Sequence, residues 1–168
     1  VSRSSPLYLF SRFLIFVVSR VFYKLRVRGV ENLPAKGPAL LVSNHTSLMD
    51  AVWILSLRRR RIRFLVSRIY LEERGWLLRA LLKISGAIPI YEGDGPKALI
   101  RALGEAKKAR EDGFIVGVFP EGRLTRTGHL LPFKPGFDRL VKETGVPVLP
   151  VGIYGGFRTF AGLGRAEV

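Results

Sequence analysis

The sequence predicts an α/β domain in which a mixed, mainly parallel sheet is flanked by helices and preceded by an amphipathic helix. Short apolar runs typical of strands alternate with longer runs of helical periodicity, and this alternation favours strands joined by crossover helices. Two polar motifs also come directly after apolar runs, as expected where strands end beside a cleft. With 168 residues, 48% of them hydrophobic, the chain has one domain's length and can bury a core.

Six strands are expected, each an apolar run bounded by turn residues, with helices between them. They cover residues 24–30, 39–43, 62–66, 87–90, 114–119 and 148–153. The clearest helix begins at residues 94–96, because Asp94 can cap it and Pro96 can occupy its first turn. One face of this helix is apolar and carries Leu99, Ile100, Leu103 and Ala106. No internal repeat or long linker interrupts the pattern, so we expect one domain.

Residues 1–25 are expected to form an amphipathic helix that lies on a membrane surface. The segment is almost continuously apolar after residue 6, but a narrow polar stripe at helical spacing interrupts it. The stripe consists of Ser11, Arg12, Ser19, Arg20 and Lys24. The longest uninterrupted apolar run, residues 13–18, is much shorter than the roughly twenty residues of a membrane span. An interfacial helix therefore fits better than a spanning one, and a core-packing helix is the alternative.

The chain is strongly basic. Lys and Arg number 28 against 13 Asp and Glu, which gives a net charge of +15. A field of this size attracts anionic lipid headgroups, anionic thioesters or nucleic acid. The densest basic segment is Arg58-Arg59-Arg60-Arg61, followed by Arg63, and a solvated helix end is its alternative interpretation. Since no aromatic platform accompanies the basic residues, nucleic acid is not the expected partner.

The first polar motif spans residues 44–50 and reads N-H-T-S-L-M-D. A turn followed by the first winding of a helix can fold Asp50 back toward His45, with Thr46 or Ser47 capping the helix. Asp50 at one ring nitrogen would fix the tautomer of His45 and leave the other nitrogen to remove a proton from a hydroxyl. A capped helix without catalytic function is the alternative, since a His and an Asp five residues apart are common.

A covalent nucleophile, a metal site and a cofactor are not expected. The chain has no cysteine and no G-x-S-x-G motif, so direct attack by a substrate hydroxyl is simpler than a covalent intermediate. His45 and His129 are the only histidines, and no spacing of carboxylates resembles a metal site.

The second polar motif, F-P-E-G-R at residues 119–123, follows the apolar run 114–118. Gly122 permits a turn with exposed backbone amides. Arg123 and Arg126 supply planar donors that match phosphate oxygens. The motif therefore predicts a phosphate-binding loop at the end of a strand.

Together these motifs resemble the lysophospholipid and glycerol-phosphate acyltransferase family, which includes the 1-acylglycerol-3-phosphate acyltransferases. The family's N-H-x4-D and F-P-E-G blocks are both present. Residues 132–137 resemble its F-K-x-G element, and residues 146–151 its V-P-x-x-P-V strand, so the similarity covers about residues 26–153. The sequence departs from the family at two positions that bind the acceptor phosphate. Residues 86–93 contain no arginine, and Leu124 stands where many members have one. Residues 119–128 are most similar to the 2-acylglycerophosphoethanolamine acyltransferase domains fused to acyl-carrier-protein synthetases.

The resemblance implies a glycerol-3-phosphate acyltransferase-like fold, with residues 26–168 as the acyltransferase domain. It implies transfer of a fatty acyl group from an acyl thioester, on coenzyme A or acyl carrier protein, to a hydroxyl of lysophosphatidylethanolamine or lysophosphatidic acid. The protein would act at the cytoplasmic face of the cell membrane, peripheral or monotopic, on anionic lipid. Because the sequence begins with Val1 and shows no signal cleavage site, we expect an excerpt of a longer chain.

The resemblance also assigns roles to individual residues. His45 would be the general base and Asp50 would stabilise its imidazolium, while amides near Gly122 are candidates to stabilise an oxyanion. Residues expected to bind the acceptor are Glu121, Gly122, Arg123, Arg126 and Lys134. Among them, Glu121 would orient an arginine or a headgroup hydroxyl, because two anions repel. The alternatives are a catalytically silent lipid-binding domain and a basic nucleic-acid-binding module.

Overall fold

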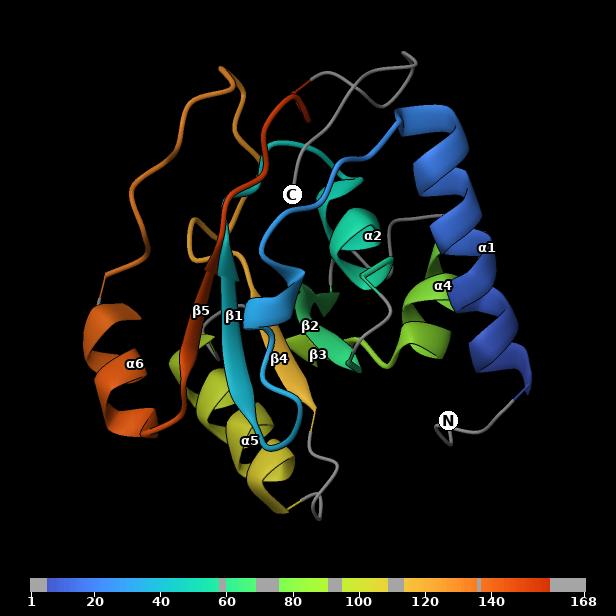
Figure 1. Cartoon of the computed structure of the whole chain (residues 1–168). Coiled ribbons are helices and arrows are strands. Elements are labelled where there is room, and N and C mark those ends of the chain that lie inside the picture. Colours follow the sequence, from blue (N-terminus) through green and yellow to red (C-terminus); the bar gives the residue numbers. More distant parts are fainter. Residues whose placement is uncertain are drawn as a thin grey trace.

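In the computed structural model, one sheet of five strands forms the centre of the molecule (Figure 1). The structure describes residues 6–57, 60–68, 76–90, 95–108, 114–135 and 137–157. The strands within these ranges are β1 (Ala39–Ser43), β2 (Ile62–Ser67), β3 (Ile88–Ile90), β4 (Ile115–Val118) and β5 (Val148–Val151). The helices are α1 (Pro6–Tyr23), the 3-10 helix η1 (Val30–Asn32), α2 (Asp50–Leu55), α4 (Trp76–Ser85), α5 (Gly95–Lys108) and α6 (Phe137–Thr144). The order across the sheet is β3-β2-β4-β1-β5.

Strand β1, which lies between β4 and β5, is buried on both faces, and its side chains alternate between two cores. Leu41 packs with Trp53 and Ile54 of α2, whereas Leu40 packs with Leu99 and Leu103 of α5. This alternation follows from the pleat of a strand, whose successive side chains point to opposite faces. Helices on both faces of a parallel sheet explain why the strand is continuously apolar in sequence.

Five of the six predicted strands are confirmed, with bounds that differ by at most two residues. The strand predicted at residues 24–30 is wrong. Lys24 has a φ of 47° and Gly29 a φ of 72°, so two left-handed residues bracket the run and prevent continuous extended backbone. The sheet was predicted to be mixed but mainly parallel, and it is parallel at every neighbouring pair of its described strands.

The helix predicted to begin at residues 94–96 is confirmed as α5, with Pro96 in its first turn. Its predicted cap, Asp94, lies outside the described residues. On the predicted apolar face Leu99 and Leu103 are buried but Ile100 is exposed, because a residue one position on lies about 100° around the helix. The side chain of Ala106 lies outside the described part of the chain.

The basic run includes a structural arginine. Arg60 is buried and donates to the backbone oxygens of Pro34 (2.8 Å) and Gly37 (2.8 Å). Arg60 is therefore not part of a solvated helix end, because its guanidinium holds the turn that precedes β1. Arg58 and Arg59 lie outside the described residues.

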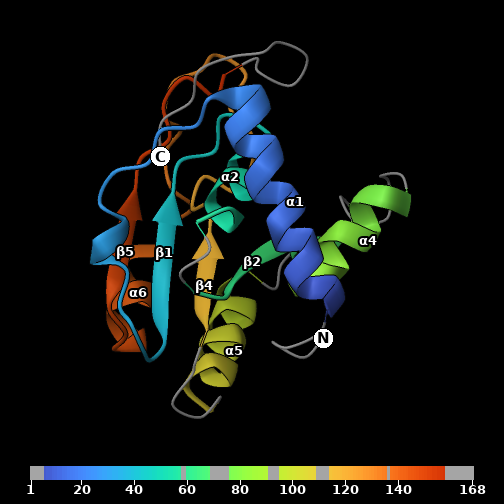
Figure 2. The ribbon, with the colours of Figure 1, turned by 45° about the vertical axis from the view of Figure 1, so that its right-hand side comes forward.

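Helix α1 packs against α2 and α4 (Figure 2). Its outer side exposes several apolar side chains. Ile15 and Ser19 are buried on its inner side. The exposed apolar residues are Leu9, Phe10, Phe13, Leu14, Val21 and Phe22. The predicted polar stripe is wrong at Ser19, which faces inward, while Arg20 is exposed and donates to the Leu25 oxygen at 3.0 Å. None of the described helices is both long and apolar enough to cross a membrane.

Candidate active site

The two polar motifs meet at the carboxyl edge of the sheet. β1 and β4 are parallel neighbours with Val42 opposite Val118, so the residues that follow both strands emerge side by side (Figure 1). His45 follows β1 by two residues, and Phe119 follows β4 directly. Ligands of open parallel sheets bind outside the carboxyl ends of the strands. The prediction that both motifs lie at strand ends is confirmed.

His45 and Asp50 form a hydrogen-bonded pair at this edge. The distance from His45 Nδ1 to Asp50 Oδ2 is 3.0 Å. The Asp50 side chain is fully buried, whereas that of His45 is 18% exposed. An ionised carboxylate only accepts hydrogen bonds, so the proton of a neutral His45 lies on Nδ1 and leaves Nε2 as an acceptor. The spacing therefore brings the two side chains together as predicted.

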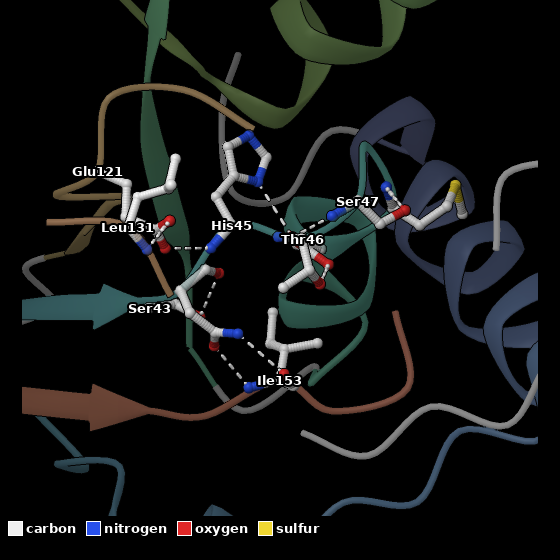
Figure 3. Close-up of polar contacts among 10 residues, drawn as sticks. Ser43, His45, Thr46, Ser47, Glu121, Leu131 and Ile153 are labelled. Carbon is white, nitrogen blue, oxygen red and sulfur yellow. Dashed lines mark hydrogen bonds and ion pairs between the residues drawn. The ribbon is translucent and has the colours of Figure 1, made fainter. Parts of the chain in front are cut away.

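Asp50 also organises the turn that carries His45. Its Oδ2 accepts hydrogen bonds from the backbone amides of Thr46 (2.6 Å) and Ser47 (2.8 Å) (Figure 3). The prediction that Thr46 or Ser47 caps the following helix is wrong, because Met49 occupies the N-cap of α2 and makes no side-chain cap bond. The carboxylate of the first helical residue reaches back to these amides instead. One buried oxygen therefore binds both the turn and the imidazole.

Asn44 ties the start of the motif to the strand on the other side of β1. Its amide nitrogen donates to the Ile153 oxygen at 2.9 Å, and its amide oxygen accepts from the Ile153 nitrogen at 2.7 Å (Figure 3). These two bonds replace a rung of the β1–β5 ladder just beyond the paired residues. No role of Asn44 was predicted from the sequence, although its place directly before His45 was the available signal.

The second motif holds the backbone of His45 from the opposite side. Glu121 is 3% exposed, and its Oε1 accepts from the His45 nitrogen at 2.8 Å. Its Oε2 accepts from the Leu131 nitrogen at 3.0 Å (Figure 3). The Thr125 nitrogen donates to the His45 oxygen at 3.1 Å. Both backbone polar groups of His45 are therefore bonded to the loop that follows β4.

These contacts change the interpretation of Glu121. It was predicted to orient an arginine or a headgroup hydroxyl, but its two oxygens bridge the backbones of His45 and Leu131. A carboxylate accepts such bonds well, since hydrogen bonds to an ionised group are stronger than neutral ones. Glu121 therefore joins the catalytic turn to the far end of the loop after β4.

The predicted anion-binding residues lie on that same loop. Gly122 has a φ of 68°, and a Cβ there would lie 2.6 Å from Lys134 Cε, so the lysine side chain crosses the glycine turn. The side chains of Lys134, Arg123 and Arg126 are exposed. Gly122 does not offer its own amide to an oxyanion, because its nitrogen donates to the Phe119 oxygen at 3.0 Å. The structure thus brings Gly122 and Lys134 together and places both arginines on the loop.

Two further contacts surround the His45–Asp50 pair. The imidazole of His45 stacks on the ring of Phe119, with centroids 3.9 Å apart. Gly156 closes the other side, since a Cβ there would lie 2.8 Å from Thr46 Oγ1 and 3.2 Å from Asp50 Oδ1. Neither contact was predicted, because both join segments far apart in the sequence.

The site combines a buried carboxylate, an imidazole hydrogen-bonded to it through Nδ1, and a loop with exposed cationic side chains at the ends of parallel strands. These groups are suited to acid–base chemistry beside an anionic substrate. Within the described residues no group of three or more His, Cys, Asp or Glu could hold a metal ion. The family model for acyltransferases matches residues 24–154. The chain therefore belongs to the acyltransferase family.

Individual relatives agree with this assignment. A chloroplastic 1-acyl-sn-glycerol-3-phosphate acyltransferase of Brassica napus is 33% identical over 136 residues, which cover 80% of this chain and 38% of that protein. A 1-acyl-sn-glycerol-3-phosphate acyltransferase of Pseudomonas aeruginosa is 31% identical over 143 residues, covering 84% of this chain and 53% of that protein. The chain thus spans roughly a third to a half of these relatives' lengths.

The fold is that of a solved acyltransferase. The crystal structure of the 1-acyl-sn-glycerophosphate (LPA) acyltransferase PlsC from Thermotoga maritima aligns with a TM-score of 0.73 at 24% identity. The alignment covers 99% of this chain and 70% of that protein. The predicted acyltransferase-like α/β architecture is confirmed.

Proposed function

We propose that this chain transfers a fatty acyl group from an acyl thioester to a free hydroxyl of a lysophospholipid at a membrane surface. The observation that carries the proposal is the 3.0 Å contact between His45 Nδ1 and buried Asp50 Oδ2, at the edge where the basic loop also lies. The family assignment supplies the class of reaction. The relatives are 1-acyl-sn-glycerol-3-phosphate acyltransferases, which favours lysophosphatidic acid as acceptor. The sequence of residues 119–128 favours lysophosphatidylethanolamine.

In the proposed mechanism, Nε2 of His45 removes the proton of the acceptor hydroxyl as its oxygen attacks the thioester carbonyl. The tetrahedral intermediate then expels the thiolate, which takes the proton from the imidazolium and leaves as a thiol. Asp50 stabilises the imidazolium between these steps. General-base catalysis of this kind contributes about a hundredfold to ten-thousandfold, so binding and orientation of the two substrates supply the rest.

Arg123, Arg126 and Lys134 are proposed to bind the acceptor phosphate. All three are exposed cations on the loop after β4, and guanidinium groups match phosphate oxygens with two parallel hydrogen bonds. Glu121 supports the acceptor indirectly, by fixing the loop to the backbone of His45. Coenzyme A and acyl carrier protein both remain candidate carriers of the acyl group, because both thioesters are anionic.

The proposed location is the cytoplasmic face of the membrane. The exposed apolar face of α1 and the net charge of +15 support peripheral attachment to anionic lipid, because apolar burial and electrostatic attraction add in interfacial binding.

The deciding experiment compares the two histidines of the chain. Thiol release is measured on liposomes that contain lysophosphatidic acid, lysophosphatidylethanolamine or glycerol 3-phosphate, with long-chain acyl-coenzyme A or acyl carrier protein as donor. We expect His45→Ala to lower kcat by roughly a hundredfold or more. His129→Ala is the matched control. It should retain activity, because the His129 side chain is exposed and is not part of the His45–Asp50 pair.

The same assay separates the alternatives. Acceptor-dependent release that both histidine variants retain would contradict a general base at His45. Binding of lysophospholipid by wild type and by His45→Ala, without thiol release in either, would identify a silent lipid-binding domain.

A further inference from the structure

Two phenylalanine rings stack in series behind the imidazole of His45. The ring of His45 is nearly parallel to that of Phe119, with an interplanar angle of 7° and centroids 3.9 Å apart. Phe119 in turn stacks against Phe64, with an angle of 12° and centroids 5.1 Å apart. His45 is thus in contact with a ring that is itself held by a second ring.

The sheet builds this series through a glycine. Phe64 of β2 lies opposite Gly117 of β4, and a Cβ on Gly117 would lie 2.6 to 2.9 Å from three atoms of the Phe64 ring. The ring therefore lies over the glycine. Phe119 follows Gly117 by two residues and so projects to the same face. Any larger residue at 117 would displace Phe64 from the space beside Phe119.

The backbone and hydrogen-bond contacts of His45 do not by themselves fix its ring. Glu121 and Thr125 bind the backbone of His45, which leaves both side-chain torsions free. Asp50 binds one ring atom, which leaves the ring able to swing about that contact. A flat contact with Phe119 restricts this remaining motion and so determines where Nε2 points.

The stacked Phe119 ring would also stabilise the positive charge that the proposed reaction places on His45. The face of an aromatic ring is electron-rich and attracts cations placed over it. In the proposed mechanism His45 becomes a cation after it removes the proton, with Asp50 at its edge and Phe119 at its face. The same ring thereby orients the neutral base and stabilises its protonated form.

We propose that Phe119 is a positioning residue for His45, supported by Phe64 across Gly117. This inference rests on the proposed function of His45 as the general base. A packing role alone would predict a loss of stability without a specific change in the imidazole. The two roles are separable because the chain offers a buried phenylalanine, Phe114, at the other end of the same strand.

The experiment compares Phe119→Leu with Phe114→Leu. Phe114 is buried just before β4, and its ring centroid lies 4.6 Å from the guanidinium carbon of Arg63, so its loss tests the removal of a ring that does not contact His45. We expect Phe119→Leu to lower kcat about tenfold or more, with the KM of the acceptor within about twofold, because a misplaced catalytic group costs rate more than binding. Phe119→Tyr keeps the ring and should restore kcat to within about threefold of wild type. Phe114→Leu should leave kcat within about twofold at a comparable loss of stability in urea unfolding.

A second measurement follows the imidazole directly. Nitrogen-15 NMR of histidine-labelled protein, assigned with His129→Gln, should show His45 as a single tautomer protonated on Nδ1. In Phe119→Leu, and more weakly in Phe64→Leu, we expect the two ring-nitrogen signals to move toward each other as the tautomers mix. Unchanged His45 signals in both variants, or equal losses of kcat in Phe119→Leu and Phe114→Leu, would overturn the proposal.

This measurement does not depend on turnover. If wild type releases no thiol with any acceptor, the proposed function fails while the NMR comparison still decides whether Phe119 orders His45. If wild type is active and the signals do not respond to loss of the ring, the positioning proposal fails alone.

Discussion

At the scale of single residues, His45 is held by segments from three parts of the chain. Asp50 binds its ring, and Glu121 and Thr125 bind its backbone. The preceding Asn44 pairs with Ile153 beyond β5. Catalytic groups must be fixed to within a fraction of an ångström to act, and here strands on both sides of β1 contribute to that fixation.

The charge of Asp50 can be separated from its geometry. In Asp50→Asn the amide oxygen can occupy the place of Oδ2 and accept from Thr46, Ser47 and the imidazole, but it carries no charge to stabilise the imidazolium. We expect kcat to fall roughly a hundredfold to ten-thousandfold with little change in thermal unfolding. Asp50→Ala should lower activity similarly and also destabilise the fold by about 1–3 kcal/mol, because two buried amides lose their acceptor.

Steady-state kinetics and thermal unfolding of the two variants check this prediction. If Asp50→Asn keeps the wild-type kcat, the buried carboxylate serves only to hold the turn, and its charge is not part of the chemistry.

The pair of His45 and Asp50 could be predicted from sequence because both members are chemically distinctive and close in the chain. The partners of Glu121 could not. They are the backbone amides of His45 and Leu131, and since every residue except proline carries such an amide, no residue type marks them. Phe119 was recognised as part of a motif, but its stacking on His45 depends on the pairing of β1 with β4.

At the scale of elements, strands were predicted well where burial dictated them. β1 matches its predicted bounds because an apolar run buried on both faces has few alternatives. The strand predicted at residues 24–30 is wrong because its extent was inferred from composition. Lys24 and Gly29 adopt left-handed backbone conformations, which a strand cannot contain. The predicted N-cap of α2 is wrong because Met49 occupies that position. The Ser47 hydroxyl accepts from the Met49 amide instead, and Asp50 accepts from the amides of Thr46 and Ser47, which precede the helix.

Helix α1 supports a prediction about membrane attachment. Phe10 and Phe13 are both more than half exposed on its outer face, and burial of a phenylalanine in an apolar environment stabilises by about 1.5–3 kcal/mol. The double variant Phe10→Ser, Phe13→Ser should therefore bind vesicles at least roughly tenfold more weakly, with thermal unfolding nearly unchanged. Co-sedimentation with liposomes measures the binding.

The matched control is Ile100→Ser. Ile100 is an exposed apolar residue of α5, a helix that packs against the other face of the sheet from α2. Equal vesicle binding by wild type and the α1 double variant would show that the outer face of α1 does not contact lipid.

At the scale of the whole molecule, the strand order β3-β2-β4-β1-β5 brings the two motifs together. Residues 44–50 and 119–123 are about seventy positions apart but follow adjacent strands. Local patterns predict the strands but not their order, because order is set by pairings between distant segments. The resemblance to a known family implied the fold, and the comparison with a solved acyltransferase confirmed it.

The net charge of +15 predicts that binding of the whole molecule to anionic membranes depends on salt. A basic residue near an anionic membrane contributes about 1 kcal/mol, and this attraction is screened by salt within a Debye length of about 10 Å at 0.1 M. We expect binding to vesicles rich in anionic lipid to weaken by roughly tenfold or more when salt is raised from about 0.05 M to about 0.5 M. Binding to uncharged vesicles should change little, because apolar burial by α1 is not screened.

One co-sedimentation experiment can vary both the salt concentration and the outer face of α1. If charge and the α1 face act independently, Phe10→Ser, Phe13→Ser should lose the same factor in affinity at low and at high salt, since contributions from separate contacts add in free energy. Salt-independent binding to anionic vesicles would instead mean that the basic surface faces away from lipid. The charge would then be available to the anionic acyl donor, and the salt dependence should appear in the KM of the thioester.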